Sequence, residues 1–229
     1  MHTLQRLYLP DDIPGQIEAW QLKLDLRMPF QDADWILLSK SERDHVMRFH
    51  LHADQVRSVA SRALLRKLLA EKTGMRPEAL RFEINDYGKP ALQGHDRIEF
   101  NVSHSGDFAM IAISTSGSVG VDIERYDRRI DVKSLGEFVF TPAERKIPLK
   151  TTEAFINHWV MKESVLKALG VGIADHLQSI SIVPTDTEHC HIVHASPQWK
   201  SLRVWRIPAP DGYAAALAIL NRAIDMVKS

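Results

Sequence analysis

The sequence predicts an α+β protein made of two similar halves, each with a helix packed on a small, mostly antiparallel sheet. Two apolar-striped helices are expected at residues 53–72 and 153–169. Each is followed, at a similar distance, by a glycine-led apolar strand, at 106–113 and 212–219. This likeness indicates an internal duplication, and chance similarity between two ordinary amphipathic helices is the alternative explanation. If the duplication is real, a ligand would most naturally lie between the halves, residues 1–118 and 119–229.

Each element of the first half has a local pattern that predicts it. Residues 17–26 alternate in part between apolar and polar side chains, which predicts a strand. Residues 41–49 are expected to form a short helix with Ser41 as its N-cap. In the 53–72 helix, apolar residues recur along one face and Gly74 is a natural stop. Gly, Asp and Ser turns then separate expected strands at residues 80–84, 98–102, 108–113 and 119–123.

The second half repeats this alternation of helix and strand patterns. Helices are expected at residues 131–137, 142–145 and 153–169, and strands at 179–183, 189–193, 202–206 and 213–220. Residues 184–201 match no motif, so their role stays open.

Composition excludes several classes of function. The chain has 229 residues, of which 29 are Lys or Arg and 29 are Asp or Glu, so no overall charge favours nucleic acid or a membrane surface. The single Cys190 rules out an intramolecular disulfide and is typical of a reducing compartment. No stretch approaches the roughly 18 apolar residues of a membrane span, and residues 1–14 lack a signal-peptide pattern. A cytoplasmic protein is therefore expected.

Three acidic residues and one lysine point to metal and phosphate chemistry. Asp122 and Glu124 are two apart on an expected strand, so they face the same way. Glu163 interrupts the apolar stripe of the 153–169 helix, and Lys167 follows one turn later. Because a buried carboxylate is costly unless it is paired or bound to a metal, these residues suggest Mg²⁺ or Mn²⁺ holding a phosphorylated ligand. The alternatives are a solvated acidic strand end and a simple Glu163–Lys167 pair.

A polar segment at residues 100–106 ends a strand in a turn. Ser103 and His104 are adjacent, so on a strand they face opposite ways and cannot form a nucleophile–base pair. They could bind an anion together with the amides near Gly106, or form a plain polar turn. A second turn at residues 86–90 carries Lys89, which is either solvated or in contact with a phosphate. Neither a Gly-x-Ser-x-Gly elbow nor a Walker-type loop occurs in the sequence.

In this order and with these spacings, the segments resemble those of the Sfp-type 4′-phosphopantetheinyl transferases. The resemblance rests on residues 87–90 (Tyr-Gly-Lys-Pro), 100–106 (Phe-Asn-Val-Ser-His-Ser-Gly), 120–124 (Gly-Val-Asp-Ile-Glu) and 159–167 (Trp-Val-Met-Lys-Glu-Ser-Val-Leu-Lys). A weaker match at Arg48-Phe49 and Arg57-Ser58 extends it upstream, so that it covers about residues 40–172.

The resemblance implies an enzyme that transfers the 4′-phosphopantetheine arm of coenzyme A to a serine of an apo acyl or peptidyl carrier protein, releasing 3′,5′-ADP. It implies two similar α+β halves related by a pseudo-twofold, with the coenzyme in the cleft between them. Such a cleft needs no partner subunit, so a monomer is expected. A module that binds coenzyme A or a carrier protein without reacting is the alternative. Fatty-acid, polyketide and nonribosomal-peptide carriers all present such a serine, so the sequence does not name the carrier.

The resemblance also assigns roles by position. Asp122, Glu124 and Glu163 would hold Mg²⁺, and Lys167 would neutralise a phosphate oxygen. Glu163 is also the candidate general base for the carrier serine. The residues that would contact the coenzyme are Arg57, Ser58, Lys89, Ser103 and His104, the first two near its 3′-phosphate.

The sequence departs from the family pattern at one place. Where relatives often carry lysines for the 3′-phosphate, this chain has Glu42 and His45. Arg43 or Arg48 would then supply the positive charge.

A basic run follows the acidic strand and consists of Arg125, Arg128, Arg129 and Lys133. It is either a solvated loop or a positive rim that attracts an acidic carrier protein.

Overall fold

The fold is built around two antiparallel sheets, each covered on one face by a long helix. The computed structural model describes residues 2–127, 130–172, 176–185 and 190–222. The elements of the first half are β1 (Thr3–Arg6), β2 (Ile17–Lys23), α1 (Asp32–Trp35), α2 (Lys40–Val46), α3 (His52–Thr73), η1 (Pro77–Ala79), β3 (Phe82–Ile84), β4 (Pro90–Leu92), β5 (Glu99–Ser105) and β6 (Phe108–Ser114). Those of the second are β7 (Gly117–Arg125), α4 (Val132–Val139), η2 (Glu144–Lys146), α5 (Thr152–Leu169), β8 (Ile180–Pro184), β9 (Cys190–His194), η3 (Pro197–Trp199), β10 (Leu202–Arg206) and β11 (Tyr213–Asn221).

The two halves share one strand order. In the first, β2, β6 and β5 lie side by side, with β1 added outside β2; in the second, β7, β11 and β10 lie side by side. In each half, the strand that precedes the long helix pairs antiparallel with the last strand of that half. Ile17 of β2 lies opposite Ser114 of β6, and Gly117 of β7 lies opposite Asn221 of β11. The predicted α+β fold with two similar halves is confirmed.

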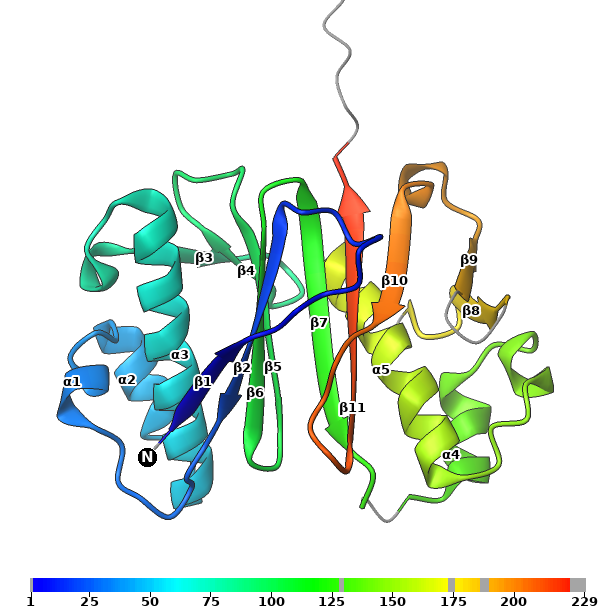
Figure 1. Cartoon of the computed structure of the whole chain (residues 1–229), viewed down its shortest axis with the longest axis horizontal. Coiled ribbons are helices and arrows are strands. Elements are labelled where there is room, and N and C mark those ends of the chain that lie inside the picture. The colour runs from blue at the N-terminus through cyan, green and yellow to red at the C-terminus, as the bar shows by residue number, and fades with distance from the viewer. Residues whose placement is uncertain (1, 128–129, 173–175, 186–189, 223–229) are drawn as a thin grey trace, which may run out of the picture.

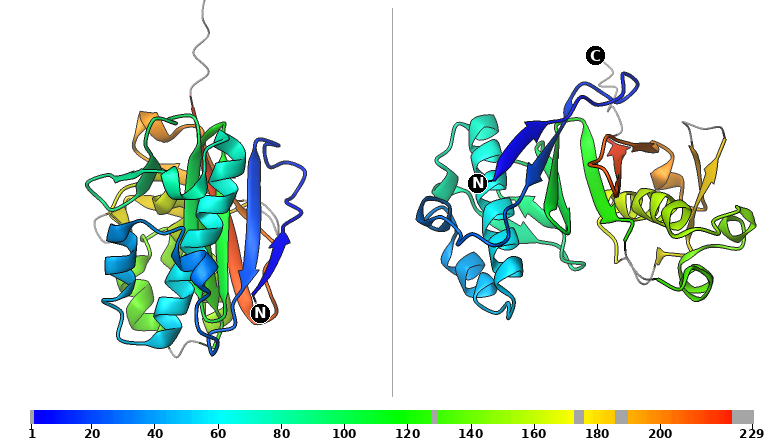
Figure 2. Two further views of the ribbon diagram at one scale, coloured as in Figure 1. Left: turned by 90° about the vertical axis from the view of Figure 1, so that its left-hand side faces the viewer. Right: turned by 60° about the horizontal axis from the view of Figure 1, so that its bottom comes forward.

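The two helices lie on the outside and the two sheets face each other in the middle (Figures 1 and 2). Alternation along β6 shows why. Ala109, Ile111 and Ile113 pack with the apolar face of α3, whereas Met110 and Ala112 pack against the second sheet. Each strand therefore contributes one set of side chains to a helix and the other to the core between the sheets.

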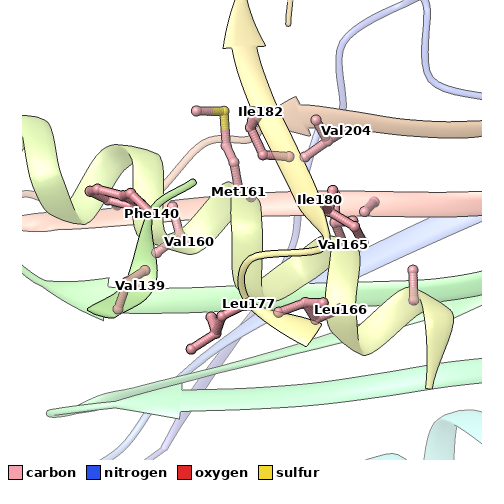
Figure 3. Close-up of a cluster of buried hydrophobic side chains, with 14 of the residues drawn as sticks. Val139, Phe140, Val160, Met161, Val165, Leu166, Leu177, Ile180, Ile182 and Val204 are labelled. Carbon is pink, nitrogen blue, oxygen red and sulfur yellow. The ribbon is translucent and has the colours of Figure 1, made fainter. Parts of the chain in front are cut away.

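The second half is built in the same way. Ala214, Ala216 and Ala218 of β11 face α5, and the residues between them face the first sheet. Figure 3 shows the α5 side of this core, where Val165 lies among side chains from β8 and β10. The segment before β2 joins the central core through Leu7 and Ile13, so this core is shared by both halves.

Several local predictions need correction. The N-cap of α2 is Ser39, not Ser41: the Ser39 hydroxyl accepts from the Glu42 amide at 3.3 Å, and the Glu42 carboxylate accepts from the Ser39 amide at 2.7 Å. Residues 142–145 contain a short 3-10 turn rather than an α-helix. No local pattern predicts β1, α1 or β4, each of three or four residues, because pairing and packing stabilise such short elements. The expected strand at 189–193 begins at a residue outside the described ranges.

None of the helices in the described ranges is long and apolar enough to cross a membrane.

Candidate active site

The two halves meet along a seam between β5 and β7. These strands lie side by side, but they are not joined by backbone-to-backbone hydrogen bonds. Instead, every second side chain of β5 accepts a hydrogen bond from a backbone amide of β7. The oxygens of Asn101, Ser103 and Ser105 accept from the backbone amides of Val121, Ile123 and Arg125, at 3.0, 3.4 and 3.3 Å respectively. The same residues that the sequence presents as a polar strand end therefore join the two halves.

Helix α5 crosses β7 at Gly120, and this crossing builds the site. A Cβ atom on Gly120 would lie 2.0 Å from the Ser164 carbonyl oxygen, so only glycine allows the helix to approach this closely. Residues 120, 122 and 124 share one face of the strand. The approach at Gly120 therefore places Glu163 and Lys167 of α5 over the carboxylate of Asp122.

Asp122 lies at the centre of the site and is 2% exposed. Its Oδ1 accepts from the Ser103 hydroxyl at 2.7 Å and from the Lys167 ammonium at 2.5 Å. Its Oδ2 is buried and has no hydrogen-bond partner within the described part of the chain. Lys167 Nζ also lies 3.4 Å from Glu163 Oε2, and Glu124 accepts from the Ser105 hydroxyl at 2.7 Å.

The charges of this site act strongly on one another. Burial and the neighbouring charge of Asp122 raise the pKa of Glu163 to about 7, although Lys167 opposes the shift. Burial would lower the pKa of Lys167, but Asp122 and Glu163 outweigh it and raise that pKa above its usual range. Lys167 is therefore a fixed cation, whereas Glu163 can bind or release a proton near neutral pH.

A cation fits this arrangement. The carboxylates of Asp122 and Glu163 share the single Lys167 ammonium, so one negative charge remains in excess when Glu163 is ionised. The buried Asp122 Oδ2 can accept a ligand, and carboxylate oxygens suit Mg²⁺ or Mn²⁺. Among the described residues, no group of three or more His, Cys, Asp or Glu side chains is already arranged to hold a metal ion. At this site the Lys167 ammonium contacts both Asp122 and Glu163.

A cavity of about 300 Å³ opens between α3 and β5, close to this site. His104 lines it, while the preceding Ser103 turns the other way and bonds Asp122. The cavity walls are formed by His45, Phe49, Asp54, Arg57, Ser58, Ser61, Arg62, Leu65, Pro90, Asn101, Val102 and His104. Desolvation by these walls, and then the positive charge of Arg57, lower the pKa of His104.

The structure brings only part of the predicted coenzyme set to this cavity. Arg57, Ser58 and His104 line it. Arg57 is positioned by Asp54 and by the Gly106 carbonyl, at 3.3 Å from Nε and 3.1 Å from Nη2.

Lys89, Arg43 and Arg48 lie elsewhere. The Lys89 ammonium donates to the Ser118 hydroxyl at 2.6 Å and to the carbonyls of Val119 and Ala168 at 3.3 and 3.1 Å, which uses all its donors and ties β7 to α5. Burial lowers the pKa of Lys89 to about 8. Arg43 lies over the Trp35 ring at 6.0 Å, and Arg48 is exposed; neither lines the cavity.

Sequence reasoning missed two groups of residues. In the first group, Glu42 accepts from Arg66 at 2.7 and 3.0 Å and lies 3.4 Å from Arg62 Nε. A second buried cluster joins Glu144 to His158 and Lys162. Charged residues inside an apolar helix stripe are the only signal for either group, and the sequence does not identify their partners.

Comparisons with known proteins identify the family of this chain. A family model described as "4'-phosphopantetheinyl transferase, N-terminal" matches residues 30–116, and one described as "4'-phosphopantetheinyl transferase superfamily" matches residues 118–218. The 4′-phosphopantetheinyl transferase HetI of Nostoc sp. is 30% identical over 94% of this chain and 94% of its own length. A 4′-phosphopantetheinyl transferase of Bacillus subtilis is 30% identical over 71% of this chain and 73% of its own.

Among solved structures, a holo-(acyl-carrier-protein) synthase from Bacillus anthracis in complex with CoA (3',5'-ADP) is similar with a TM-score of 0.40 and 20% identity. That similarity covers 47% of this chain and 98% of the other. The relative from Nostoc sp. matches nearly the whole chain, and the two family models divide it between them. The chain is an enzyme that belongs to the 4′-phosphopantetheinyl transferase superfamily.

Proposed function

We propose that this transferase moves the 4′-phosphopantetheine arm of coenzyme A to a serine of an apo acyl or peptidyl carrier protein, with release of 3′,5′-ADP. The observation that carries the proposal is the cluster of Asp122, Glu163 and Lys167 at the seam between the halves. The cluster and the cavity are neighbours on β5, because Ser103 bonds Asp122 and the next residue, His104, lines the cavity. The charged groups proposed to act on a pyrophosphate thus lie next to a cavity that could hold the rest of a nucleotide.

Asp122, Glu124 and Glu163 would hold Mg²⁺, and Mn²⁺ suits the same oxygens. The support for this assignment is the unpartnered Asp122 Oδ2 and the excess negative charge around it. When bound, such an ion would neutralise charge on the pyrophosphate of the coenzyme.

Lys167 and Glu163 have separate tasks in the proposal. The Lys167 ammonium, held by Asp122 and Glu163, would neutralise a phosphate oxygen as charge develops on the departing 3′,5′-ADP. Glu163, with a pKa raised by burial and by Asp122 to about 7, is matched to accepting the proton of the carrier serine near neutral pH. Both tasks use groups that α5 presents on one face.

The cavity would hold the remainder of coenzyme A. Arg57, Ser58 and His104 are the contacts we keep from the sequence prediction, because they line its walls. Ser103 would act indirectly, since its hydroxyl orients Asp122. Lys89 is left out because its three donors are already used by the protein. We further expect a cytoplasmic monomer.

The test is to incubate the protein with coenzyme A, Mg²⁺ and an apo carrier protein, and to weigh the carrier by mass spectrometry. We expect the carrier to gain one phosphopantetheine arm. Asp122→Asn should reduce the rate at least about 100-fold, while Glu153→Gln, an exposed carboxylate change on the same half, should leave it unchanged. Binding of coenzyme A without transfer would favour the non-catalytic binding module. Transfer by Asp122→Asn at a near-normal rate would overturn the metal assignment.

A further inference from the structure

Arg62 of α3 forms the wall between two cavities. One is the cavity of about 300 Å³ described above, and the other, of about 380 Å³, lies between α2, α3 and β3. Arg62 and Pro90 line both. The Arg62 side chain is 32% exposed, so most of it is packed and its open part faces these cavities.

The Arg62 guanidinium has hydrogen-bond donors that the protein does not use. Its Nε lies 3.4 Å from Glu42 Oε1, and its charged group lies 5.3 Å from the centre of the Phe82 ring. Within the described ranges, no acceptor forms a hydrogen bond with its terminal nitrogens. Its neighbours differ: Arg57 donates to Asp54 and Gly106, and Arg66 donates to Glu42 and to two backbone carbonyls.

Glu42 does not cancel this charge. Its Oε2 accepts hydrogen bonds from two nitrogens of Arg66, a side chain that is only 1% exposed. This oxygen is therefore used by Arg66 and not by Arg62. Two guanidinium groups against one carboxylate leave one positive charge, and it lies at the cavity wall on Arg62. A planar guanidinium that lies over a ring and has free donors is suited to a phosphate group.

We propose that Arg62 binds the 3′-phosphate of coenzyme A and so selects coenzyme A over its 3′-dephospho form. The inference rests on the proposed function. Coenzyme A carries a pyrophosphate and one phosphate monoester, and the pyrophosphate is assigned to the carboxylates and Lys167. The monoester is then the remaining anion, and Arg62 is the arginine of the cavity whose donors are unused. Arg62 therefore takes the part that the sequence suggests for Arg43 or Arg48.

The experiment compares coenzyme A with 3′-dephospho-coenzyme A in transfer to an apo carrier protein. In Arg62→Gln, kcat/KM for coenzyme A should fall about 10- to 100-fold, the loss expected for hydrogen bonds to a charged group, while that for the dephospho form should change less than about threefold. Arg76→Gln is the matched control, because it removes an exposed arginine charge outside both cavities. Equal losses on both substrates would overturn the proposal, because a structural role for Arg62 does not distinguish them.

Binding of product fragments tests Arg62 without the transfer reaction. The wild type should bind 3′,5′-ADP more tightly than 5′-AMP in calorimetry, and Arg62→Gln should lose this preference. Arg62→Lys keeps the positive charge without the planar guanidinium, so it should retain part of the preference for 3′,5′-ADP. This variant replaces Arg62→Gln in the test if the glutamine variant does not fold. A preference that survives both substitutions would overturn the proposal. If the wild type transfers nothing from coenzyme A, the proposed function fails, and fragment binding still decides the role of Arg62.

Discussion

At the level of single residues, the site depends on charges that the protein does not balance by itself. Asp122 has one oxygen bonded to Ser103 and Lys167 and another without a partner in the described residues. Glu163 is forced toward its neutral form by burial and by Asp122, which raise its pKa to about 7. Such strain is typical of a site that is completed by a ligand.

This imbalance predicts how stability depends on pH and Mg²⁺. The pKa of Glu163, raised by burial and Asp122 from its usual 4.5 to about 7, means that the folded state holds this proton more tightly than the unfolded state. Without divalent ions, the free energy of unfolding should therefore fall as pH rises from about 4.5 to 7. Mg²⁺ should restore stability above pH 7 and do little near pH 5, because protons compete for the same carboxylate.

Denaturant titrations at several pH values, with and without Mg²⁺, measure this effect. In Glu163→Gln the fall in stability between pH 4.5 and 7 should be smaller, whereas Glu153→Gln should behave like the wild type. Stabilisation by Mg²⁺ that is equal at pH 5 and pH 8 would contradict the prediction.

Lys167 should act more in the transition state than in substrate binding. Its ammonium is placed to meet a phosphate oxygen, and the charge on that oxygen grows as 3′,5′-ADP leaves. Lys167→Ala should therefore lower kcat by more than it raises the KM for coenzyme A. Lys23→Ala, which removes an exposed lysine on β2, is the control. An effect on KM alone would limit Lys167 to ground-state binding.

At the level of elements, helix α5 is held from two sides. Gly120 lets it lie directly on β7, and a buried network fixes its other face. Glu144 of η2, which is fully buried, accepts from His158 at 3.1 Å, from Lys162, and from the Ile182 amide at 2.9 Å. Lys162 directly precedes Glu163 in α5, so this network holds the turn of the helix that carries Glu163, the proposed general base.

Removing the Glu144 charge should destabilise the fold. Burial would raise the pKa of the Glu144 carboxyl, but the hydrogen bond from His158 and the charge of Lys162 outweigh it and hold that pKa at about 2. Because this value lies below the usual 4.5, the stabilisation is present above about pH 4.5 and is lost as pH falls toward 2. Glu144→Gln leaves Lys162 buried without a counter-charge and should cost about 3–5 kcal/mol of unfolding free energy at pH 7.

The measurement is urea unfolding at pH 7 and at a series of lower pH values. Glu137→Gln on α4, an exposed carboxylate, is the matched control and should stay close to the wild type. A Glu144→Gln variant as stable as the wild type at pH 7 would show that the network contributes no net stability.

At the level of the whole molecule, the site must be reached by a carrier protein, and α4 offers a surface for it. The helix follows β7 along the chain (Figure 1). It presents an exposed Phe138. A cavity of about 700 Å³ beside it is lined by Lys133, Arg145, Lys146 and Lys150 among other residues. Of the basic run noted in the sequence, Arg125 pairs with Asp127, and Arg128 and Arg129 lie outside the described residues.

Reversing charge on this surface should weaken docking of an acidic carrier. Lys133→Glu combined with Lys150→Glu should raise the KM for the carrier several-fold and spare that for coenzyme A, because charges at the edge of an interface act mainly on association. The penalty should shrink between about 50 and 300 mM salt, as screening increases. Lys23→Glu with Lys67→Glu, both exposed in the first half, is the control. Normal carrier kinetics at low salt would place the docking surface elsewhere.

The sequence by itself determined the fold class and the family, and it also predicts the four residues that we propose for the centre of the site. Strand and helix periodicities predict that Asp122 and Glu124 share one face and that Glu163 and Lys167 share another, because both are local properties of the backbone. Spacing along the chain is therefore enough to propose them.

Only the tertiary structure decided which polar residues meet. Ser103 bonds Asp122 while His104 faces the cavity, Lys89 is used in joining β7 to α5, and Arg62 is left with free donors. These outcomes depend on partners distant in the chain, which come together only when the helices pack on the two sheets. A charged residue looks the same in the sequence whether its partner is another side chain or a ligand, and the difference lies in the contacts that packing leaves open.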